Sequence, residues 1–594
     1  MVIELFLRVF GYGHDTSLFI RYPDNTDYWV INKYASERYF SDTSNATKGS
    51  IEPFKAEKAP NTFRIFVLGE STTAGYPYFH NGSFHRWLLY RLMHTYPGLH
   101  FEIINVSLTA VNSYTVLDFG KQVANYQPDA VLVYTGHNEY YGALGIGSTS
   151  HIANNRFLVN TVLELRKLRL VQLIDNIIAA FKATTSSGTT TDQRTNLMER
   201  MAASQQIAYG SPEYQAGIKQ FHDNMDELCQ LMQHKKIPIF LSTLVSNERG
   251  LKPFISAPGK SGSADELFNL ANAAYAAGNY PIAKRQYDKA RDLDLLRFRA
   301  PEAINQEIVA LTKKYSDVHL VDTKQEFEQH SPHGILGSET ILEHVHPNLY
   351  GYALLSDAFY QSIKKADLIK AQADKEMPLD MLLKEMPVTK VDSLNGVYTI
   401  MMLETGWPFN KPIPADFNRG TTIEEQLAGA LAVGKMSWLD AINMLFQYSV
   451  KANDKKTALK AVEAVMLEYP QNTTYQIYAG RLSFEVGDYD KSVYYFKLLY
   501  DNDPTLENTQ DMYLVLLKTD QPEKALKYID DAAQLKGNSQ QLESLKTIVN
   551  EIIQLKAQLA ASPGSKDIGG HIAMDYRKIG ADEAANKYQR VAAP

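Results

Sequence analysis

The chain has 594 residues, of which 45% are apolar and 21% are charged, and its formal net charge is −7. That length exceeds what one hydrophobic core supports, so at least two domains are expected. The mildly acidic balance argues against a nucleic-acid partner, which requires clustered lysine and arginine. The single cysteine, Cys229, excludes a disulfide framework and any cysteine-based metal site.

The first ten residues read MVIELFLRVF. A helix of this length, at about 1.5 Å per residue, covers roughly half of a bilayer core. Glu4 and Arg8 interrupt the apolar run, and a basic region and a cleavage site typical of signal peptides are lacking. Two interpretations remain open: a short amphipathic helix docked on the protein, or the stub of a membrane anchor. Residues 1–60 are therefore expected to form an N-terminal, membrane-proximal segment.

Residues 61–365 alternate strands and helices. Five short runs rich in β-branched and apolar residues predict strands at residues 63–69, 101–106, 129–136, 237–244 and 318–323. Helical patterns lie between them, the first two at about 84–96 and 114–126. Strands that alternate with helices predict a parallel sheet covered on both faces, which is a three-layer α/β fold.

Two insertions interrupt this pattern. Residues 150–210 hold an amphipathic helical stretch followed by the polar sequence TTSSGTTTDQ, which is expected to be loose. Residues 265–295 read as two helices that turn at Gly278, with small residues where the helices must approach closely. This second insertion resembles a tetratricopeptide unit.

Residues 370–594 are expected to be all-helical. Ala458, Ser492 and Ala525 occupy equivalent places after a helix-start turn and recur after 34 and 33 residues, the tetratricopeptide period. Such helix pairs stack on one another, and their concave groove commonly binds a protein partner. The repeats are clearest at 454–534, while the stretch from residue 562 is expected to be a frayed or capping end.

Four polar clusters stand out in the α/β region: GESTTAG at 69–75, NVSLTA at 105–110, GHNE at 136–139 and EHVHPN at 343–348. The first three directly follow predicted strands, and the fourth lies just before the last predicted helix. Carboxyl ends of parallel strands are where α/β sheets place their active sites. A serine directly after a strand, such as Ser71, can be exposed to a substrate, although a helix cap is the plainer interpretation. An amide such as Asn138 can donate to a developing oxyanion, although it could instead form a turn.

The EHVHPN cluster has two interpretations. A carboxylate three residues before a histidine can fold back and orient the ring, as Glu343 would for His346. Two histidines and a glutamate so close together could instead bind a metal. A further ligand cluster of comparable clarity is lacking in the sequence, so no metal and no cofactor are expected.

Taken in order, these clusters resemble the four blocks of the SGNH (GDSL-like) serine hydrolases. The resemblance implies that Ser71 is the nucleophile, His346 its base and Glu343 the group that orients His346. It implies an oxyanion hole formed by the amides of Ser71 and Ala110 and the side chain of Asn138. Three positions depart from the family pattern, because Glu70 and Glu343 each replace an aspartate and Ala110 replaces a glycine.

The resemblance implies a serine ester hydrolase that cleaves a small acyl ester, such as an acetyl group on a cell-envelope glycan. Tyr76, Tyr140 and Tyr141 flank the blocks and are candidates for stacking on a sugar ring. The alternatives are an O-acyltransferase with the same site, and a non-catalytic tetratricopeptide scaffold with a relic hydrolase domain. The combination of blocks and repeats also resembles bacterial envelope proteins with an N-terminal membrane helix, which implies a membrane-associated, extracytoplasmic protein.

Overall fold

The computed structural model divides the chain into two compact units. The first unit comprises Met1–Met386 and Asp392–Gly420, and the second comprises Pro387–Val391 and Thr421–Pro594. The structure describes residues 2–147, 156–185, 197–202, 205–259, 262–371, 373, 376–415, 417, 420–537 and 539–592.

A five-stranded parallel sheet forms the centre of the first unit. Its strands are β4 (Thr62–Gly69), β5 (His100–Asn105), β6 (Ala130–Tyr134), β7 (Ile239–Ser242) and β8 (Val318–Val321). Their order is β5-β4-β6-β7-β8: the chain enters the sheet at β4, adds β5 on one side of it and then adds β6, β7 and β8 in turn on the other side. This is the flavodoxin-like order, which opens a crevice at the carboxyl ends of β4 and its neighbours. All five predicted strands are confirmed.

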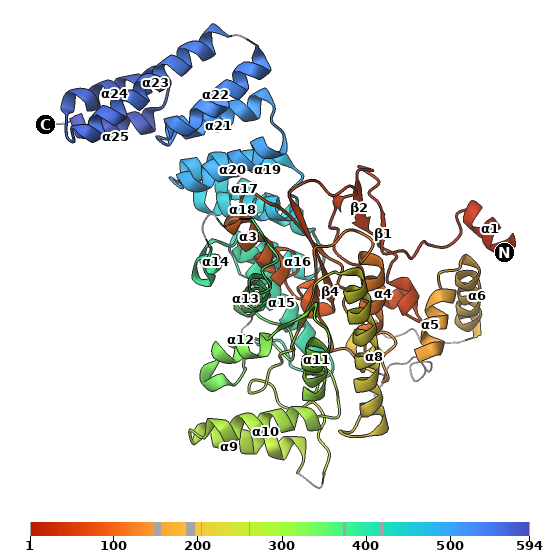
Figure 1. Cartoon of the computed structure of the whole chain (residues 1–594). Coiled ribbons are helices and arrows are strands. Elements are labelled where there is room, and N and C mark those ends of the chain that lie inside the picture. The colour runs from red at the N-terminus through yellow and green to blue at the C-terminus, as the bar shows by residue number, and fades with distance from the viewer. Residues whose placement is uncertain are drawn as a thin grey trace. The chain divides into compact units, whose positions relative to one another are not determined.

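Helices cover both faces of this sheet, with α3 and α13 on one side of β4 and α4 and α8 on the other (Figure 1). These helices are α3 (Phe84–Thr95), α13 (Leu349–Lys365), α4 (Ser113–Val123), α8 (Pro212–Lys235) and α11 (Glu302–Lys314), the last of which packs on α8. The three-layer α/β fold is therefore confirmed. Cys229 is buried on α8, as expected for a packing residue, and burial raises the pKa of its thiol to about 12.

Residues before the sheet form helix α1 (Val2–Val9) and a small antiparallel sheet, β1 (Phe19–Arg21), β2 (Tyr28–Ile31) and β3 (Phe54–Lys55). The rings of Phe19 and Phe54 lie 5.8 and 5.5 Å from that of Phe66 in β4, so these aromatic side chains attach the small sheet to the parallel sheet. Across the described parts of the chain, a helix with the length and apolar character needed to cross a bilayer is not found.

The two insertions are helical. The first contains α5 (Arg156–Leu165), α6 (Arg169–Thr185) and α7 (Leu197–Ala202); most of the segment expected to be loose, from residue 186, lies outside the described residues. The second is the helix pair α9 (Ala264–Ala276) and α10 (Tyr280–Leu293), joined at Gly278 as predicted. Ala271, Ala283 and Tyr287 form its shared core.

The boundary between the units falls later than the expected residue 370. The first unit contains α12 (Thr323–Gln329), α13 and α14 (Leu379–Glu385). It also contains most of α15 (Lys390–Thr405) and the segment that follows, up to residue 420. The reason is a close helix contact: a Cβ atom on Gly396 would lie only 2.0 Å from the ring of Tyr78. Glycine lets α15 lie directly on that ring.

The second unit is all-helical, so this part of the predicted fold class is confirmed as well. Ala458, Ser492 and Ala525 lie in the first turns of α18, α20 and α22, and each is fully buried where neighbouring helices meet. Of the two alternatives for the stretch from residue 562, a frayed end or a capping end, its described residues fit the capping end, because Ile572 and Tyr576 are part of the repeat core. The helices are α16 (Ile423–Ala432), α17 (Trp438–Lys451), α18 (Lys455–Glu468), α19 (Thr473–Glu485), α20 (Tyr489–Asn502), α21 (Leu506–Lys518), α22 (Pro522–Lys536), α23 (Gln540–Ala561), α24 (Lys566–Lys578) and α25 (Asp582–Ala592).

Candidate active site

Ser71 is the first residue of the short helix α2 (Ser71–Ala74), directly beyond the carboxyl end of β4. Gly69 makes this turn possible, since a Cβ atom there would lie 2.2 Å from the carbonyl oxygen of Tyr134 in β6. Thr73 then donates to the same carbonyl at 2.6 Å and fixes α2 against β6. Ser71 itself is partly exposed.

Ser71 and His346 lie 275 residues apart in the chain, yet the Oγ atom of Ser71 is 2.8 Å from the Nε2 atom of His346. The other ring nitrogen of His346, Nδ1, contacts the Oε1 atom of Glu343. The structure therefore brings together the three residues that the sequence singled out for nucleophile, base and orienting group. A hydroxyl, an imidazole and a carboxylate connected in this order form the arrangement that activates a serine.

A compact loop carries Glu343 and His346. The backbone N–H of Leu342 donates to the carbonyl of His346 at 2.8 Å, and Ile341 pairs with Pro347 in an antiparallel bridge. Asn348 ends the loop, because its side chain accepts from the N–H of Gly351 at 2.8 Å and caps α13. The loop thus folds back on itself, and the Glu343 carboxylate accepts from the N–H of His346 at 3.1 Å.

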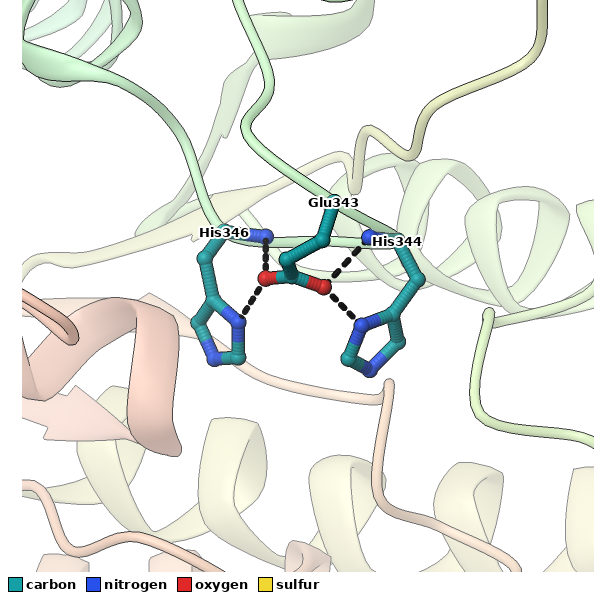
Figure 2. A group of neighbouring side chains, drawn as sticks. All are labelled: Glu343, His344 and His346. Atoms are coloured by element: carbon teal, nitrogen blue, oxygen red, sulfur yellow. Dashed lines mark hydrogen bonds and ion pairs between the residues drawn. The ribbon is translucent and has the colours of Figure 1, made fainter. Parts of the chain in front are cut away.

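The Glu343 carboxylate is buried and ionised. Burial alone would raise its pKa, but the adjacent His344 and His346, which donate to it, hold the pKa well below its usual range. Glu343 also contacts the Nδ1 atom of His344 through its second oxygen, so the two histidines lie on opposite sides of one carboxylate (Figure 2). The His344 ring is packed against aromatic side chains, and its Nδ1 atom nevertheless contacts the carboxylate.

These three side chains are also close enough to hold a metal. The ligand atoms of Glu343, His344 and His346 lie within 4.8 Å of one another, and no other such group of three occurs among the described residues. Two histidines and a glutamate are a known zinc set. Here, however, both Nδ1 atoms face the carboxylate oxygens, and the Nε2 atom of His346 faces Ser71. These atoms therefore have hydrogen-bond partners within the protein.

Asn138 and Ala110 lie on the loops after β6 and β5. The N–H of Asn138 donates to the Oε2 atom of Glu70 at 3.0 Å, which places Asn138 next to the residue that precedes Ser71. The carbonyl of Ala110 accepts from the N–H of Ala143 at 2.9 Å, so its loop is joined to the segment that follows Asn138. Ala110 has a φ of 60°, a left-handed conformation that favours glycine, the residue the family pattern has there.

Glu70 is a positioning group whose role the sequence did not define. Its buried carboxylate accepts from the Thr135 hydroxyl at 2.7 Å and from the N–H of Gly136 at 2.9 Å, in addition to Asn138. Burial raises the pKa of Glu70 to about 7, and the nearby Glu139 also acts to raise it. Glu139 is itself buried, with its pKa raised to about 7 by the same cause, and accepts from Ser113 and Gln220.

Two further residues, to which the sequence assigned no role, lie beside these groups. The Tyr352 hydroxyl, from α13, lies 3.1 Å from the carbonyl of Thr72 and 2.6 Å from that of Tyr76, and so links the helix after the histidine loop to the serine loop. His137 accepts from the N–H of Ala300 at 3.2 Å, and burial, together with the nearby His344 and His346, lowers its pKa to about 3. Neither follows from a local pattern.

The three tyrosines proposed to contact substrate differ. Tyr76 is partly exposed, and its ring lies 4.7 Å from that of His346, so it borders the site. Tyr140 and Tyr141 are buried, which makes their predicted role wrong. Their hydroxyls donate to the backbone carbonyls of Tyr214 and Gln205, so they are core residues that anchor the loop after β6.

No family model and no curated protein matches the chain. Among solved structures, similar chains include a GDSL-like lipase from Bacteroides thetaiotaomicron (13% identity, covering 51% of this chain and 88% of that chain, TM-score 0.25). The acetyl xylan esterase AlAXEase (13%, 51% and 100%, 0.26) and the MamA protein (16%, 26% and 89%, 0.18) are others. Likeness at such identities and scores says nothing of activity, which depends on the residues of this chain.

Proposed function

We propose that the first unit is a serine ester hydrolase that cleaves a small acyl ester, with an O-acetyl group on a cell-envelope glycan as the substrate class. The observation that carries this proposal is a chain of two contacts. Ser71 Oγ lies 2.8 Å from His346 Nε2, and His346 Nδ1 contacts the Glu343 carboxylate. A hydroxyl activated in this way attacks carbonyl carbon. The partly exposed ring of Tyr76 borders the site and would contact the sugar.

The reaction proceeds in two acyl-transfer steps. Ser71 Oγ attacks the ester carbonyl while its proton moves to His346 Nε2, and the ionised Glu343 stabilises the imidazolium that forms. The amides of Ser71 and Ala110 and the Asn138 side chain are the proposed donors to the tetrahedral oxyanion. His346 then returns the proton to the leaving alcohol, and the acyl group remains on Ser71. Water, deprotonated by His346, releases the acid and restores the serine.

The direct test is covalent labelling with a fluorophosphonate, together with hydrolysis of p-nitrophenyl acetate. The full chain should label and release p-nitrophenol, and Ser71→Ala should do neither. Labelling that persists in Ser71→Ala would place the nucleophile elsewhere, and a wild-type chain that does not label would favour the scaffold alternative. Acyl transfer to an added sugar in preference to water would identify a transferase.

We also propose that the N-terminal helix attaches this unit to a membrane surface. Helix α1 presents a charged side chain to the protein and its apolar side chains to solvent. Glu4 faces inward and accepts from the N–H groups of Arg169 and Leu170, at 3.1 and 2.9 Å, at the start of α6. The apolar side chains of α1 and the residue after it instead face solvent, with Val2, Leu5, Phe6, Val9 and Phe10 all between 59% and 83% exposed.

Exposed apolar residues of the first insertion extend this surface. Ile174, Ile177 and Ile178 of α6 are each 46–47% exposed, and α1 packs beside α6 (Figure 1). A large exposed apolar patch marks an interaction surface. A helix with one broad apolar face and charges opposite is typical of helices that lie in the lipid interface, so a bilayer surface is the proposed occupant.

A further inference from the structure

The Glu343 carboxylate is divided between two histidines (Figure 2). Its Oε1 atom faces the Nδ1 of His346 and its Oε2 atom faces the Nδ1 of His344. The backbone N–H groups of both histidines also point at these oxygens, one at each. His346, the proposed base, therefore contacts only one oxygen of the carboxylate. The position of that oxygen depends on the groups that bind the other oxygen.

His344 is itself firmly held. Its ring is buried and lies among three phenylalanine rings, those of Phe254, Phe298 and Phe409, at centroid distances of 6.0, 6.0 and 5.7 Å with interplanar angles of 60–70°. Edge-to-face contacts of this kind fix ring orientation. Burial lowers the pKa of His344 against the opposing effect of Glu343, so the ring is neutral and donates from Nδ1.

A firmly held donor such as His344 restricts the flexible side chain of Glu343. A glutamate has one more rotatable bond than the aspartate found at this position in the family pattern, so it loses more side-chain entropy when it is fixed. Without the His344 ring, the far oxygen would keep only the backbone N–H of His344, and the carboxylate could swing away from the His346 ring. A displacement of about 1 Å at a reacting group can cost about 10²-fold in rate. A donor on the far oxygen removes that freedom.

We propose that His344 is a positioning residue, and that the site is a line of four groups, Ser71, His346, Glu343 and His344. This rests on the proposed hydrolase function. His344 contacts neither Ser71 nor the reacting carbonyl; it acts through Glu343, and Phe254, Phe298 and Phe409 hold it in place. Phe409 comes from the loop after α15, so a segment beyond the expected end of the hydrolase domain contributes to the site.

A pair of substitutions separates the donor of His344 from its ring. His344→Asn keeps an N–H donor the same number of bonds from Cα as Nδ1 but loses the ring. His344→Phe keeps a ring for the three phenylalanines but loses the donor. The measurements are the rate at which a fluorophosphonate labels Ser71 and the kcat and KM for p-nitrophenyl acetate, each with the melting temperature of the full-length variant.

We expect His344→Phe to slow labelling and kcat by about 10- to 100-fold with KM unchanged. His344→Asn should stay within about threefold of the wild type, because the donor is the part that matters. Should His344→Phe not fold, His344→Gln serves in its place, since it moves the donor by one methylene and should be slower than His344→Asn.

The proposal would be overturned by a His344→Phe variant that labels at the wild-type rate, by a His344→Asn variant as slow as the His344→Phe variant, or by a fall confined to KM. Loss of wild-type labelling on chelation, with recovery on adding zinc, would also overturn it by making His344 a ligand. A wild-type chain that never labels would instead contradict the hydrolase function itself, which keeps the two failures distinct.

Discussion

The backbone N–H of Asn138 donates a hydrogen bond to the buried carboxylate of Glu70 at 3.0 Å. This bond joins the loop after β6 to the residue immediately before Ser71. Because Glu70 also accepts from Thr135 and Gly136, one carboxylate sets the spacing between the nucleophile and the proposed amide donor. A carboxylate is suited to this position, since all of its partners are donors.

Replacing that carboxylate by an amide should disturb the spacing. In Glu70→Gln one oxygen becomes an NH₂ group, which must face an N–H or O–H donor and leaves at least one buried donor unsatisfied. We expect kcat for p-nitrophenyl acetate to fall by about 10-fold or more. Glu139→Gln is the matched control, because it changes a neighbouring buried carboxylate without touching Asn138. Equal effects of the two variants would contradict a specific role for Glu70.

Asn138 itself is predicted to act through its side chain. Asn138→Ala should lower kcat by about 10²–10³-fold, the usual loss for one oxyanion donor, while leaving the backbone bond to Glu70 intact. The fluorophosphonate should still modify Ser71 in this variant. Activity within a few-fold of the wild type would remove Asn138 from the oxyanion hole.

Much of this site could be predicted because its chemistry lies at strand ends. Ser71 follows β4 and Asn138 follows β6, and parallel strands that pair must end at one edge. Glu343 and His346 were recognisable from their three-residue spacing. The pattern could not distinguish tyrosines that face a substrate from tyrosines that face the core, which is why Tyr140 was misassigned.

The remaining features depend on contacts between distant segments. Tyr352 contacts the serine loop across 280 residues, and Phe409 contacts His344 from the loop after α15, the helix that packs on Tyr78 at Gly396. Neither contact leaves a periodic or spaced signal in the sequence. The same packing moved the boundary of the first unit to residue 420, since a helix that belongs to either unit looks the same in a hydrophobic pattern.

Stability should depend on pH through Glu139. Burial raises its pKa from the ordinary 4.5 to about 7 in the folded chain, so the folded state binds more protons than the unfolded state between these values. Its contribution to the free energy of unfolding is fully present below about pH 4.5 and is lost as the pH rises through 7. The loss amounts to about 3 kcal/mol.

Glu139→Gln should remove this loss, because an amide does not ionise yet can still accept from Ser113. Urea unfolding of both chains at pH 5 and pH 8 is the measurement, and the variant should gain on the wild type by up to about 3 kcal/mol at the higher pH. If the stability of the variant fell as steeply with pH as that of the wild type, other groups would be responsible for the pH dependence.

Chelation tests the two interpretations of the EHVHPN loop. Because the Nδ1 atoms of His344 and His346 both face the Glu343 carboxylate, we expect esterase activity to survive prolonged dialysis against a strong chelator. His346→Ala should then lose far more activity than Glu343→Ala. The His346 ring transfers the proton itself, whereas the Glu343 carboxylate only orients and stabilises that ring. Loss of activity that zinc restores would contradict the triad.

The membrane surface can be tested separately from catalysis. Replacing Phe6 and Val9 of α1 by serine removes apolar area from the exposed face and leaves Glu4 at the start of α6. Each side chain buried in lipid contributes about 1.5–3 kcal/mol, so the double variant should bind vesicles at least about 10-fold more weakly. The measurement is co-sedimentation with phosphatidylcholine vesicles, with and without anionic lipid.

Leu270→Ser is the matched control, because Leu270 is 56% exposed but lies on α9, away from α1 and α6. Both variants should hydrolyse soluble p-nitrophenyl acetate at the wild-type rate. If the wild type fails to bind vesicles and instead dimerises through α1, the patch is a contact between two copies of the chain and the membrane proposal is wrong.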